Sequence, residues 1–229
     1  MQEDKYYSEK LSAERLKQCY DIANERIKQY LSAEINFVLN HIKKTDIVLE
    51  LGCGYGRVLK RLAPNAAKVF GIDTSKASLN FAREYLTGLN NIELLEMNVK
   101  ALEFPPQTFD VVLAIQNGIS AFKVAPEIVI QESLRVTKHK GKVLLSSYSE
   151  KIWEARLEWF LQQAKAGLLG EIDLEKTGNG VIIGKDGFRA TTFSREDFQQ
   201  LVNKLGLEAI IEEVDNSSIF CVITVNHAH

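Results

Sequence analysis

The stretch that decides the fold reads Leu49-Glu50-Leu51-Gly52-Cys53-Gly54-Tyr55-Gly56-Arg57. An apolar strand ends here in an acid and runs into a glycine-dense turn. Glycine allows the chain to turn sharply and allows a ligand to approach bare backbone. A helix that starts near Gly54 would point its free N–H groups at that ligand. The stretch therefore predicts a loop that binds a nucleoside cofactor.

The spacing of the glycines narrows the choice of ligand. A dinucleotide-binding loop has the pattern G-x-G-x-x-G, and its third glycine would fall at position 57, where the chain has Arg57. This departure disfavours NAD and FAD. Glu50 at the strand end would repel a pyrophosphate, but it could accept hydrogen bonds from an ammonium group. We therefore expect a zwitterionic or cationic ligand.

The composition is that of an ordinary globular protein. The chain has 229 residues, of which 45% are hydrophobic and 25% are charged, and this length suits one α/β domain with an elaboration. The 28 basic and 30 acidic residues give a net charge of −2 without long runs of one sign. We therefore expect no nucleic-acid partner.

The cysteines and the start of the chain bear on its location. Cys19, Cys53 and Cys221 lie far apart and form no C-x-x-C pair, so we predict no disulfide framework and no metal site. The neighbours of Cys53 indicate a small residue whose backbone matters, rather than a nucleophile. The first residues are polar and acidic, and no stretch approaches the ~20 apolar residues that a membrane span requires. We expect a soluble, cytoplasmic protein with no membrane partner.

The hydrophobic pattern alternates between strand and helix periods. Residues 9–43 are predicted to be helical, strands are predicted at 47–51, 68–72, 92–95, 109–115 and 142–146, and helices at 54–62, 75–86 and 127–136. Strands that alternate with helices indicate a parallel sheet. A further helix is predicted from a capping box at 194–197 to Gly206. Strands at 207–214 and 218–225 are then expected to complete the sheet as an antiparallel hairpin.

Residues 148–193 stand outside this alternation. They contain a helical pattern with Trp153, Leu157 and Phe160, followed by a glycine-rich stretch that suits short strands. The segment leaves the carboxyl end of a parallel strand, which is the end where open α/β sheets bind ligands. We therefore predict a substrate lid at about 148–193. The remainder divides into an N-terminal helical cap at 1–45 and a main domain at 46–229 that carries the lid.

The second predicted strand ends at Asp73, which lies 19 residues after Gly54. A carboxylate at this place can accept hydrogen bonds from two hydroxyl groups of a ribose. The alternative role is a helix N-cap, because Asp73, Thr74 and Ser75 all precede a helix. Both roles can coexist if Thr74 or Ser75 caps the helix, and we favour ribose binding.

Three motifs occur in the order that is typical of one enzyme family. Residues 48–56, 70–73 and 109–112 resemble the motifs of class I S-adenosylmethionine-dependent methyltransferases, and the resemblance extends over about residues 46–226. It implies a Rossmann-like, seven-stranded, mostly parallel α/β sheet with an antiparallel last strand and helices on both faces. It also implies S-adenosylmethionine as cofactor, S-adenosylhomocysteine as product, and methyl transfer (EC 2.1.1.-) as the activity.

The resemblance assigns the methionine and ribose ends of the cofactor. The loop residues Gly52, Cys53 and Gly54 are expected to hold the methionine end through their backbone. Glu50 is expected to help orient the ammonium group. Asp73 is expected to bind the ribose.

The resemblance also assigns residues to the adenine and to the reacting end. Thr74 is expected to pack beside the adenine. Asn98 and Val99 occupy the position where the family often has Asp and a small residue. Asn98 departs from that pattern, although its amide oxygen can still accept from an amino group. Gln116 and Asn117 would border the sulfonium and the methyl acceptor.

The implied reaction is an in-line displacement from a sulfonium, in which much of the catalysis comes from holding the acceptor on axis and excluding water. The histidines precede strands or lie at the terminus, and so do not suit a general base: His41, His139, His227 and His229. Either the acceptor is already nucleophilic, as a thiolate, neutral amine or carboxylate, or the base is Tyr148, Glu150 or an N-terminal tyrosine.

Aromatic residues could close over the sulfonium by cation–π contacts. Tyr6 and Tyr7 precede the first helix and form either a mobile latch or a disordered end, whereas Trp153 belongs to the lid. Ordinary packing is favoured for three aromatic residues in helical patterns: Tyr20, Trp159 and Phe160.

The acceptor is expected to be a small molecule. Residues 115–119 lack the Asn/Asp-Pro-Pro-aromatic motif of enzymes that methylate planar amides or bases, and the Pro-Cys nucleophile of cytosine-C5 enzymes is also missing. A long lid indicates an enclosed pocket. Two other functions stay open: a catalytically silent cofactor-binding subunit and, less favoured, a nicotinamide oxidoreductase. We expect a monomer or a homodimer.

Overall fold

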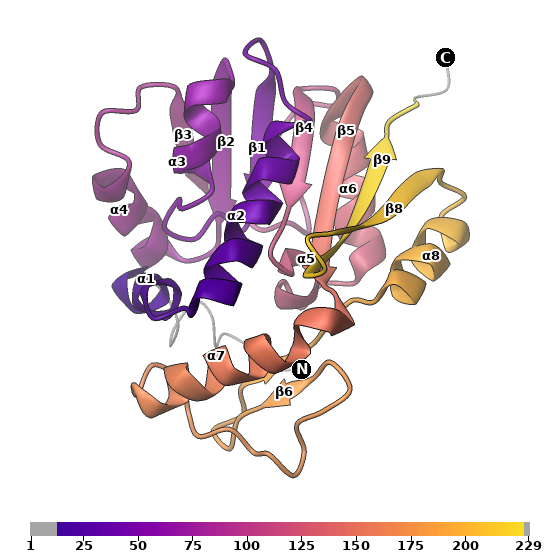
Figure 1. Cartoon of the computed structure of the whole chain (residues 1–229). Coiled ribbons are helices and arrows are strands. Elements are labelled where there is room, and N and C mark those ends of the chain that lie inside the picture. Colours follow the sequence, from indigo (N-terminus) through magenta and orange to yellow (C-terminus); the bar gives the residue numbers. More distant parts are fainter. Residues whose placement is uncertain (1–12, 227–229) are drawn as a thin grey trace.

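The computed structural model describes residues 13–226, and these are built around one seven-stranded sheet (Figure 1). The strands lie in the order β3-β2-β1-β4-β5-β9-β8. Their bounds are β1 Ile47–Leu51, β2 Lys68–Asp73, β3 Ile92–Glu96, β4 Phe109–Ala114, β5 Thr137–Tyr148, β8 Ala209–Val214 and β9 Ser218–Thr224.

Strands β1 to β5 pair in parallel, and β9 runs antiparallel to both of its neighbours, β5 and β8. The predicted fold class is therefore confirmed, including the antiparallel last strand. Because β1 and β4 are neighbours at the centre, the chain reverses direction along the sheet there. In open α/β sheets, ligands bind at the carboxyl ends of strands next to such a reversal.

Helices cover both faces of the sheet (Figure 1). One face packs against α6 (Pro126–Val136) and α8 (Arg195–Lys204), and the other against α2 (Glu25–Leu39), α3 (Leu59–Leu62) and α4 (Lys76–Tyr85). The helices bury apolar residues that recur at a period of 3.6, as in Phe198, Leu201 and Val202 of α8. The capping box predicted for α8 is present, with Ser194 and Asp197 bonded to each other's backbone N–H groups.

A third apolar cluster lies at the carboxyl edge of the sheet. It combines the N-terminal residues Cys19, Ile27 and Tyr30 with residues of the insertion that follows β5, among them Trp159 and Phe160. The insertion consists of the 3-10 helix η3 (Glu150–Ile152), helix α7 (Trp153–Lys165) and the short strands β6 (Ile182–Ile183) and β7 (Arg189–Ala190). The insertion therefore shares a core with the N-terminal helices and with the last residue of β5, Tyr148.

The helix predicted at 9–43 is interrupted in the structure. Helix α1 (Ala13–Asp21) and helix α2 are separated at Asn24, which has an extended backbone (φ −68°, ψ 169°). The Asn24 side chain accepts a hydrogen bond from the Ile27 N–H at 3.0 Å, so it caps the start of α2. The first residues of the predicted helix lie outside the described residues.

The helix predicted at 54–62 is also shorter than expected. Gly54 and Gly56 have φ values of +53° and +86°, which are outside the α-helical region. The glycines that make the loop thus delay the helix, and α3 begins only at Leu59.

Strand β5 is longer than the predicted 142–146. Its first residues pair near Phe109, and an irregularity in register precedes Val111. Gly141 sits at this irregularity, where a Cβ atom would lie 2.7 Å from the Asp110 carbonyl oxygen. The four-residue helix α5 (Gly118–Ala121) was not predicted, because it is too short to show a period.

Candidate functional site

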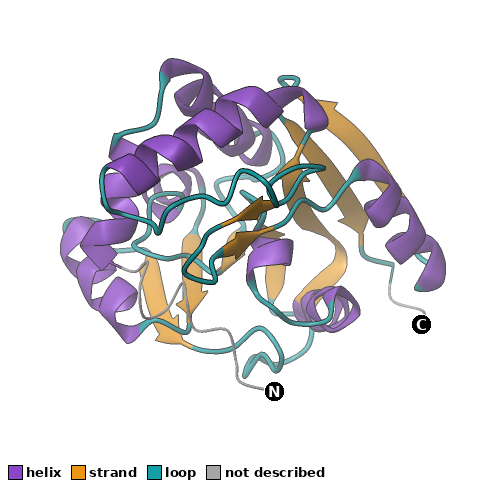
Figure 2. Cartoon of the chain, turned by 90° about the horizontal axis from the view of Figure 1, so that it is seen from below, coloured by secondary structure: helices purple, strands orange, loops and turns teal. Residues whose placement is uncertain are grey.

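A cavity of about 1080 Å³ opens at the carboxyl ends of the parallel strands. Its walls come from the glycine loop, the turns after β2, β3 and β4, helix α1 and the insertion. Figure 2 views the molecule from this end, and the strands of the insertion cross in front of the sheet. The cavity is therefore bounded by the sheet on one side and by segments far away in the sequence on the other.

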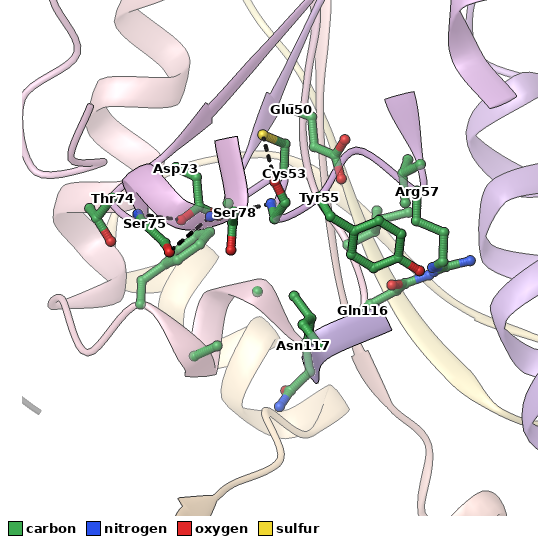
Figure 3. Close-up of a pocket in the computed structure, with 18 of the residues that line it drawn as sticks. Glu50, Cys53, Tyr55, Arg57, Asp73, Thr74, Ser75, Ser78, Gln116 and Asn117 are labelled. Atoms are coloured by element: carbon green, nitrogen blue, oxygen red, sulfur yellow. Dashed lines mark hydrogen bonds between the residues drawn. The ribbon is translucent and has the colours of Figure 1, made fainter. Parts of the chain in front are cut away.

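The glycine loop forms one wall of the cavity (Figure 3). Gly52 has a φ of +69°, and a Cβ atom there would lie 2.6 Å from the Phe122 ring. A Cβ atom on Gly56 would lie 2.6 Å from Leu86. The Cys53 N–H donates to the Ile72 carbonyl at 2.9 Å, which fixes the loop to β2. Only glycine suits the first and third positions, because both left-handed backbone and close contact exclude a side chain.

Asp73 ties the end of β2 to the glycine loop. Its Oδ2 accepts from the Gly54 N–H and its Oδ1 from the Ser75 N–H, both at 2.8 Å. Ser75, not Asp73, caps α4, since its Oγ accepts from the Ser78 N–H. Burial raises the pKa of Asp73, while these N–H donors favour its ionised form. An ionised carboxylate accepts about four hydrogen bonds, so Asp73 retains capacity for a ligand.

Glu50 is a buried acid with one oxygen whose hydrogen-bonding capacity is not used. It is 5% exposed, and within residues 13–226 its Oε2 has no hydrogen-bond partner. Burial raises the pKa of Glu50 to about 8, although the nearby Arg57 opposes the shift. A buried acceptor without a partner is costly unless a ligand satisfies it. Glu50 therefore offers a place for a positively charged donor.

Arg57 was missed as a site residue, because the sequence only showed that it replaces a glycine. Its guanidinium lies 4.7 Å from the ring centroid of Tyr20 in α1. Arg57 Nη2 and Gln116 Nε2 are buried donors without hydrogen-bond partners in the described part of the chain. Glu50, Arg57 and Gln116 all line the cavity (Figure 3), which thus combines one unused acceptor with two unused donors.

The turn after β4 is held in an unusual conformation. Gln116 and Asn117 have φ values of +56° and +64°. The Gln116 N–H donates to both Glu34 and Ser146 at 2.8 Å. Asn117 donates from Nδ2 to the Thr191 carbonyl at 2.8 Å and accepts from the Ser147 hydroxyl at 2.7 Å. This turn therefore connects the sheet to the end of the insertion.

The residues after β2 and β3 complete the wall beside the glycine loop. Thr74 and Asn98 are exposed to the cavity, and Val99 is buried at its edge. Asn98 Oδ1 accepts from the Lys100 N–H at 2.9 Å. An amide oxygen accepts two hydrogen bonds, so one remains for a ligand.

The opposite wall is largely aromatic, and we name it the insertion wall: Tyr148, Trp159, Phe160, Gln163 and Ala190. Tyr148 ends β5, and burial raises the pKa of its hydroxyl. Trp159 Nε1 donates to the Cys19 carbonyl at 2.8 Å, and the Trp159 and Tyr20 rings are 5.8 Å apart. The wall is therefore rigidly joined to α1.

Other predicted residues lie away from the cavity. Glu150 begins η3 and is exposed to solvent. Trp153 lies seven residues before Phe160, about 10 Å along the α7 axis, and does not reach the cavity. His41 Nδ1 is 2.9 Å from the Phe37 carbonyl oxygen, remote from the cavity, and His139 is exposed. Four predicted residues lie outside the described part of the chain: Tyr6, Tyr7, His227 and His229.

The described residues contain no group of three or more His, Cys, Asp or Glu side chains that could hold a metal ion. The three cysteines are free and buried. Burial raises the pKa of the Cys53 thiol well above its ordinary value, which disfavours a thiolate nucleophile. Between residues 13 and 226, no helix has both the length and the apolar character needed to cross a membrane.

Comparisons with known proteins indicate a methyltransferase domain. Residues 48–141 match the family model described as a methyltransferase domain. The chain is 36% identical over 104 residues to a phosphatidylethanolamine N-methyltransferase of Cereibacter sphaeroides, covering 44% of this chain and 50% of that protein. It is 28% identical over 167 residues to a 2-phytyl-1,4-naphtoquinone methyltransferase of Thermosynechococcus vestitus, covering 66% and 70%. The chain spans about half the length, or less, of the first curated relatives it matches.

Solved structures show the same fold at low sequence identity. A SAM-dependent methyltransferase from Aquifex aeolicus has a TM-score of 0.62 and 16% identity, with 91% of this chain and 97% of that chain covered. A SAM-dependent methyltransferase from Methanosarcina mazei has a TM-score of 0.61 and 19% identity, with 83% and 98% covered. At these identities the likeness establishes the fold alone.

Proposed function

We propose that this chain, which has the class I S-adenosylmethionine-dependent methyltransferase fold and matches a methyltransferase domain over residues 48–141, methylates a small molecule held in the cavity. The observation that carries the proposal is the set of unused polar atoms on Glu50, Arg57 and Gln116, in the cavity that Asp73 also lines. Their charges are complementary to a nucleoside that carries an amino-acid group.

The residues at the strand ends fit the cofactor, and we name Glu50, Gly52, Asp73, Thr74 and Asn98 the cofactor half of the cavity. Asp73 would accept hydrogen bonds from the ribose hydroxyls with its remaining capacity. The loop backbone from Gly52 through Cys53 to Gly54 allows close approach of the ligand.

The unused charged atoms fit the methionine end of the cofactor. Glu50 Oε2 would accept from the ammonium group, and Arg57 Nη2 with Gln116 Nε2 would donate to the carboxylate. Each pairing satisfies a buried group that is otherwise left without a hydrogen bond. The fit therefore accounts for the burial of Glu50 and for the presence of arginine at position 57.

The adenine would lie between the turns after β2 and β3. Thr74 would pack beside the ring, with Val99 on its apolar edge. Asn98 Oδ1 would use its remaining lone pair to accept from the adenine amino group. This contact lacks the charge that the more usual aspartate supplies.

When bound, S-adenosylmethionine supplies an electrophilic methyl group. The chain contributes orientation and exclusion of water. Tyr148 lines the cavity at the end of β5, and the raised pKa of its hydroxyl keeps the proton on that oxygen near neutral pH. Tyr148 therefore acts as a hydrogen-bond donor to the acceptor, rather than as a general base. Glu150 has no part in the proposed mechanism, because it does not line the cavity.

We also propose that α1 and the insertion act together as the cover of the cavity. Helix α1 is bonded to α4 through the Ala13 N–H and the Ser78 hydroxyl at 3.0 Å. It is bonded to the insertion through Arg15 and the Leu168 carbonyl at 3.0 Å, in addition to the contact with Trp159. The N-terminal cap and the lid thus behave as one unit over the main domain.

Calorimetric titration with S-adenosylmethionine, S-adenosylhomocysteine and NAD tests the proposal. We expect both S-adenosyl compounds to bind in the micromolar range and NAD not to bind. Asp73→Ala should weaken S-adenosylhomocysteine binding about 100-fold, or about 2.7 kcal/mol. Asp110→Ala is the matched control, because Asp110 accepts from the Ile47 N–H at 2.8 Å but does not line the cavity. Binding of NAD alone, or of none of the three, would overturn the proposal.

A further inference from the structure

The insertion wall and the cofactor half carry different charges. Among the described residues that line the cavity, carboxylates are confined to Glu50, the residue before the last of β1, and Asp73, the last residue of β2. The insertion wall contributes aromatic rings, an alanine and the neutral amide of Gln163. A methyl acceptor that enters against this wall therefore meets no negative side chain of the wall.

A positive charge lies directly behind the wall. Arg156 of α7 is 1% exposed, and its guanidinium is 4.1 Å from the ring centroid of Tyr148. It is fixed by donation to the Thr192 hydroxyl at 2.7 Å and to the Gly180 carbonyl at 3.1 Å. Burial has the largest effect on the Tyr148 hydroxyl and raises its pKa; of the two charges that act on it, Arg156 has the larger effect and lowers the pKa, whereas Glu34 raises it. The field of Arg156 would attract an anion beside the Tyr148 hydroxyl.

The aromatic rings are poorly arranged to hold a cation. A cage for an ammonium group needs ring faces that carry no other cation. The Tyr148 ring already stacks with Arg156, and the Tyr20 ring with Arg57 at 4.7 Å. The Phe160 ring lies 5.7 Å from the same Arg156 guanidinium. The remaining apolar faces suit a flat, uncharged ring system.

Gln163 supplies a polar group within this aromatic surface. The residue is 2% exposed and lines the cavity. Together, the Gln163 amide and the Tyr148 hydroxyl offer N–H and O–H donors to the same space. A ligand with an acceptor atom would suit donors at this place.

Resting on the proposed function, we propose that the methyl acceptor is a planar compound with an anionic oxygen, such as a phenolate, enolate or aromatic carboxylate, and not an ammonium compound. Its ring would lie against Trp159 and Phe160, and its oxygen would accept from Tyr148 or Gln163. The oxygen forms its bond to the methyl carbon as the carbon–sulfur bond breaks, and the electron pair of that bond stays on sulfur. The anion becomes a neutral ether or ester, so no proton has to leave and no general base is needed.

A matched pair of probes tests this inference. The full chain is first saturated with S-adenosylhomocysteine and then titrated with 2-naphthoate or with 2-naphthylmethylammonium, which share a ring system and differ in charge. We expect 2-naphthoate to bind at least about tenfold more tightly than the ammonium probe. Equal affinity, a preference for the ammonium probe, or no binding of 2-naphthoate up to its solubility would contradict the inference.

Two substitutions on α7 locate the preference in the insertion wall. Gln163→Glu places a carboxylate in the wall with little change of shape, and should weaken 2-naphthoate at least about tenfold while strengthening the ammonium probe. Gln162→Glu adds the same charge one residue away, outside the cavity. It should leave the ratio of the two probe affinities within about twofold of that of the unchanged protein. If Gln163→Glu does not fold, Gln163→Leu should weaken 2-naphthoate alone, by about fivefold. An unchanged ratio in the Gln163 variants would overturn the assignment.

The two proposals fail in different ways. Failure of the wild-type protein to bind S-adenosylhomocysteine would contradict the proposed function. Normal binding of S-adenosylhomocysteine without a preference for the anionic probe would contradict only the inference about the acceptor.

Discussion

The cofactor half and the insertion wall enclose one cavity, but different parts of the chain build them. The cofactor half comes from short segments at successive strand ends, in which an acid or a glycine occupies a fixed place. The insertion wall depends on contacts between distant segments, such as the bond from Trp159 to Cys19. The first half is held by backbone geometry and buried charge, whereas the second is held by packing of rings. Substitutions in the two halves should therefore have different consequences.

The largest effect is expected in the glycine loop. Gly52→Ala places a side chain at a φ of +69° and within 2.6 Å of the Phe122 ring. Gly88→Ala meets a similar backbone conformation, with φ +91°, but its side chain would have open space. Both should lose about 1–3 kcal/mol of stability. Only Gly52→Ala should weaken the binding of S-adenosylhomocysteine, by about 100-fold as measured by calorimetry. Equal affinities of the two variants would show that the loop does not contact the ligand.

The next effect concerns the pH dependence of stability. The folded state raises the pKa of Glu50 from 4.5 to about 8, so between these values the unfolded chain binds fewer protons than the folded chain. The contribution of Glu50 to stability must then fall as the pH rises. Relative to Glu50→Gln, the ligand-free protein should lose about 2 kcal/mol between pH 6 and pH 8, as measured by urea unfolding.

The other buried acid, Glu34, titrates in both proteins. Its contribution to the pH dependence of stability therefore cancels in the comparison with Glu50→Gln. Saturating S-adenosylhomocysteine should reduce the difference, because its ammonium group favours the ionised form of Glu50. A difference in stability that is flat or rises with pH would contradict the account of Glu50.

A smaller effect is expected at the insertion wall. Tyr148→Phe keeps the ring against Arg156 but removes the hydroxyl. It should weaken the binding of 2-naphthoate about tenfold and leave the affinity for S-adenosylhomocysteine within about twofold of the original value. Glu150→Gln, two residues further on and exposed, should change neither affinity. Loss of S-adenosylhomocysteine binding in Tyr148→Phe would mean that the cofactor half and the insertion wall do not bind their ligands independently.

The smallest effect is expected on the outer side of the insertion. Lys185 pairs with Glu171 at 2.6 Å, and both side chains are largely exposed. Lys185→Ala should change the stability by less than about 1 kcal/mol in urea unfolding and should not alter binding of either ligand. A larger loss would show that this exposed pair helps to hold the cover in place.

Much of the fold could be predicted from the sequence because its signals are local. The strand that contains Glu50 and the strand that ends in Asp73 are each indicated by an apolar run with an acid at or near its end. The break at Asn24 and the late start of α3 were missed. In both places a single residue type, a capping asparagine or a glycine with positive φ, overrides an apolar period that continues through it.

The part of the site that lies at the strand ends could also be predicted from the sequence. Glu50, Asp73 and Asn98 line the cavity, since strand ends bring them to one edge of the sheet. Arg57 carried no signal beyond the absence of glycine, and its position beside Tyr20 depends on how α1 packs. The wall residues Trp159 and Gln163 face the cavity because the insertion shares a core with α1, and no local pattern reveals that contact.

The most direct test is a crystal structure of the full chain with S-adenosylhomocysteine. We expect ribose hydroxyls within about 3 Å of the Asp73 carboxylate, the ammonium group at Glu50, and the sulfur atom facing the insertion wall. A nucleoside bound against the insertion wall, with Asp73 and Glu50 making no contact to it, would contradict the division of the cavity.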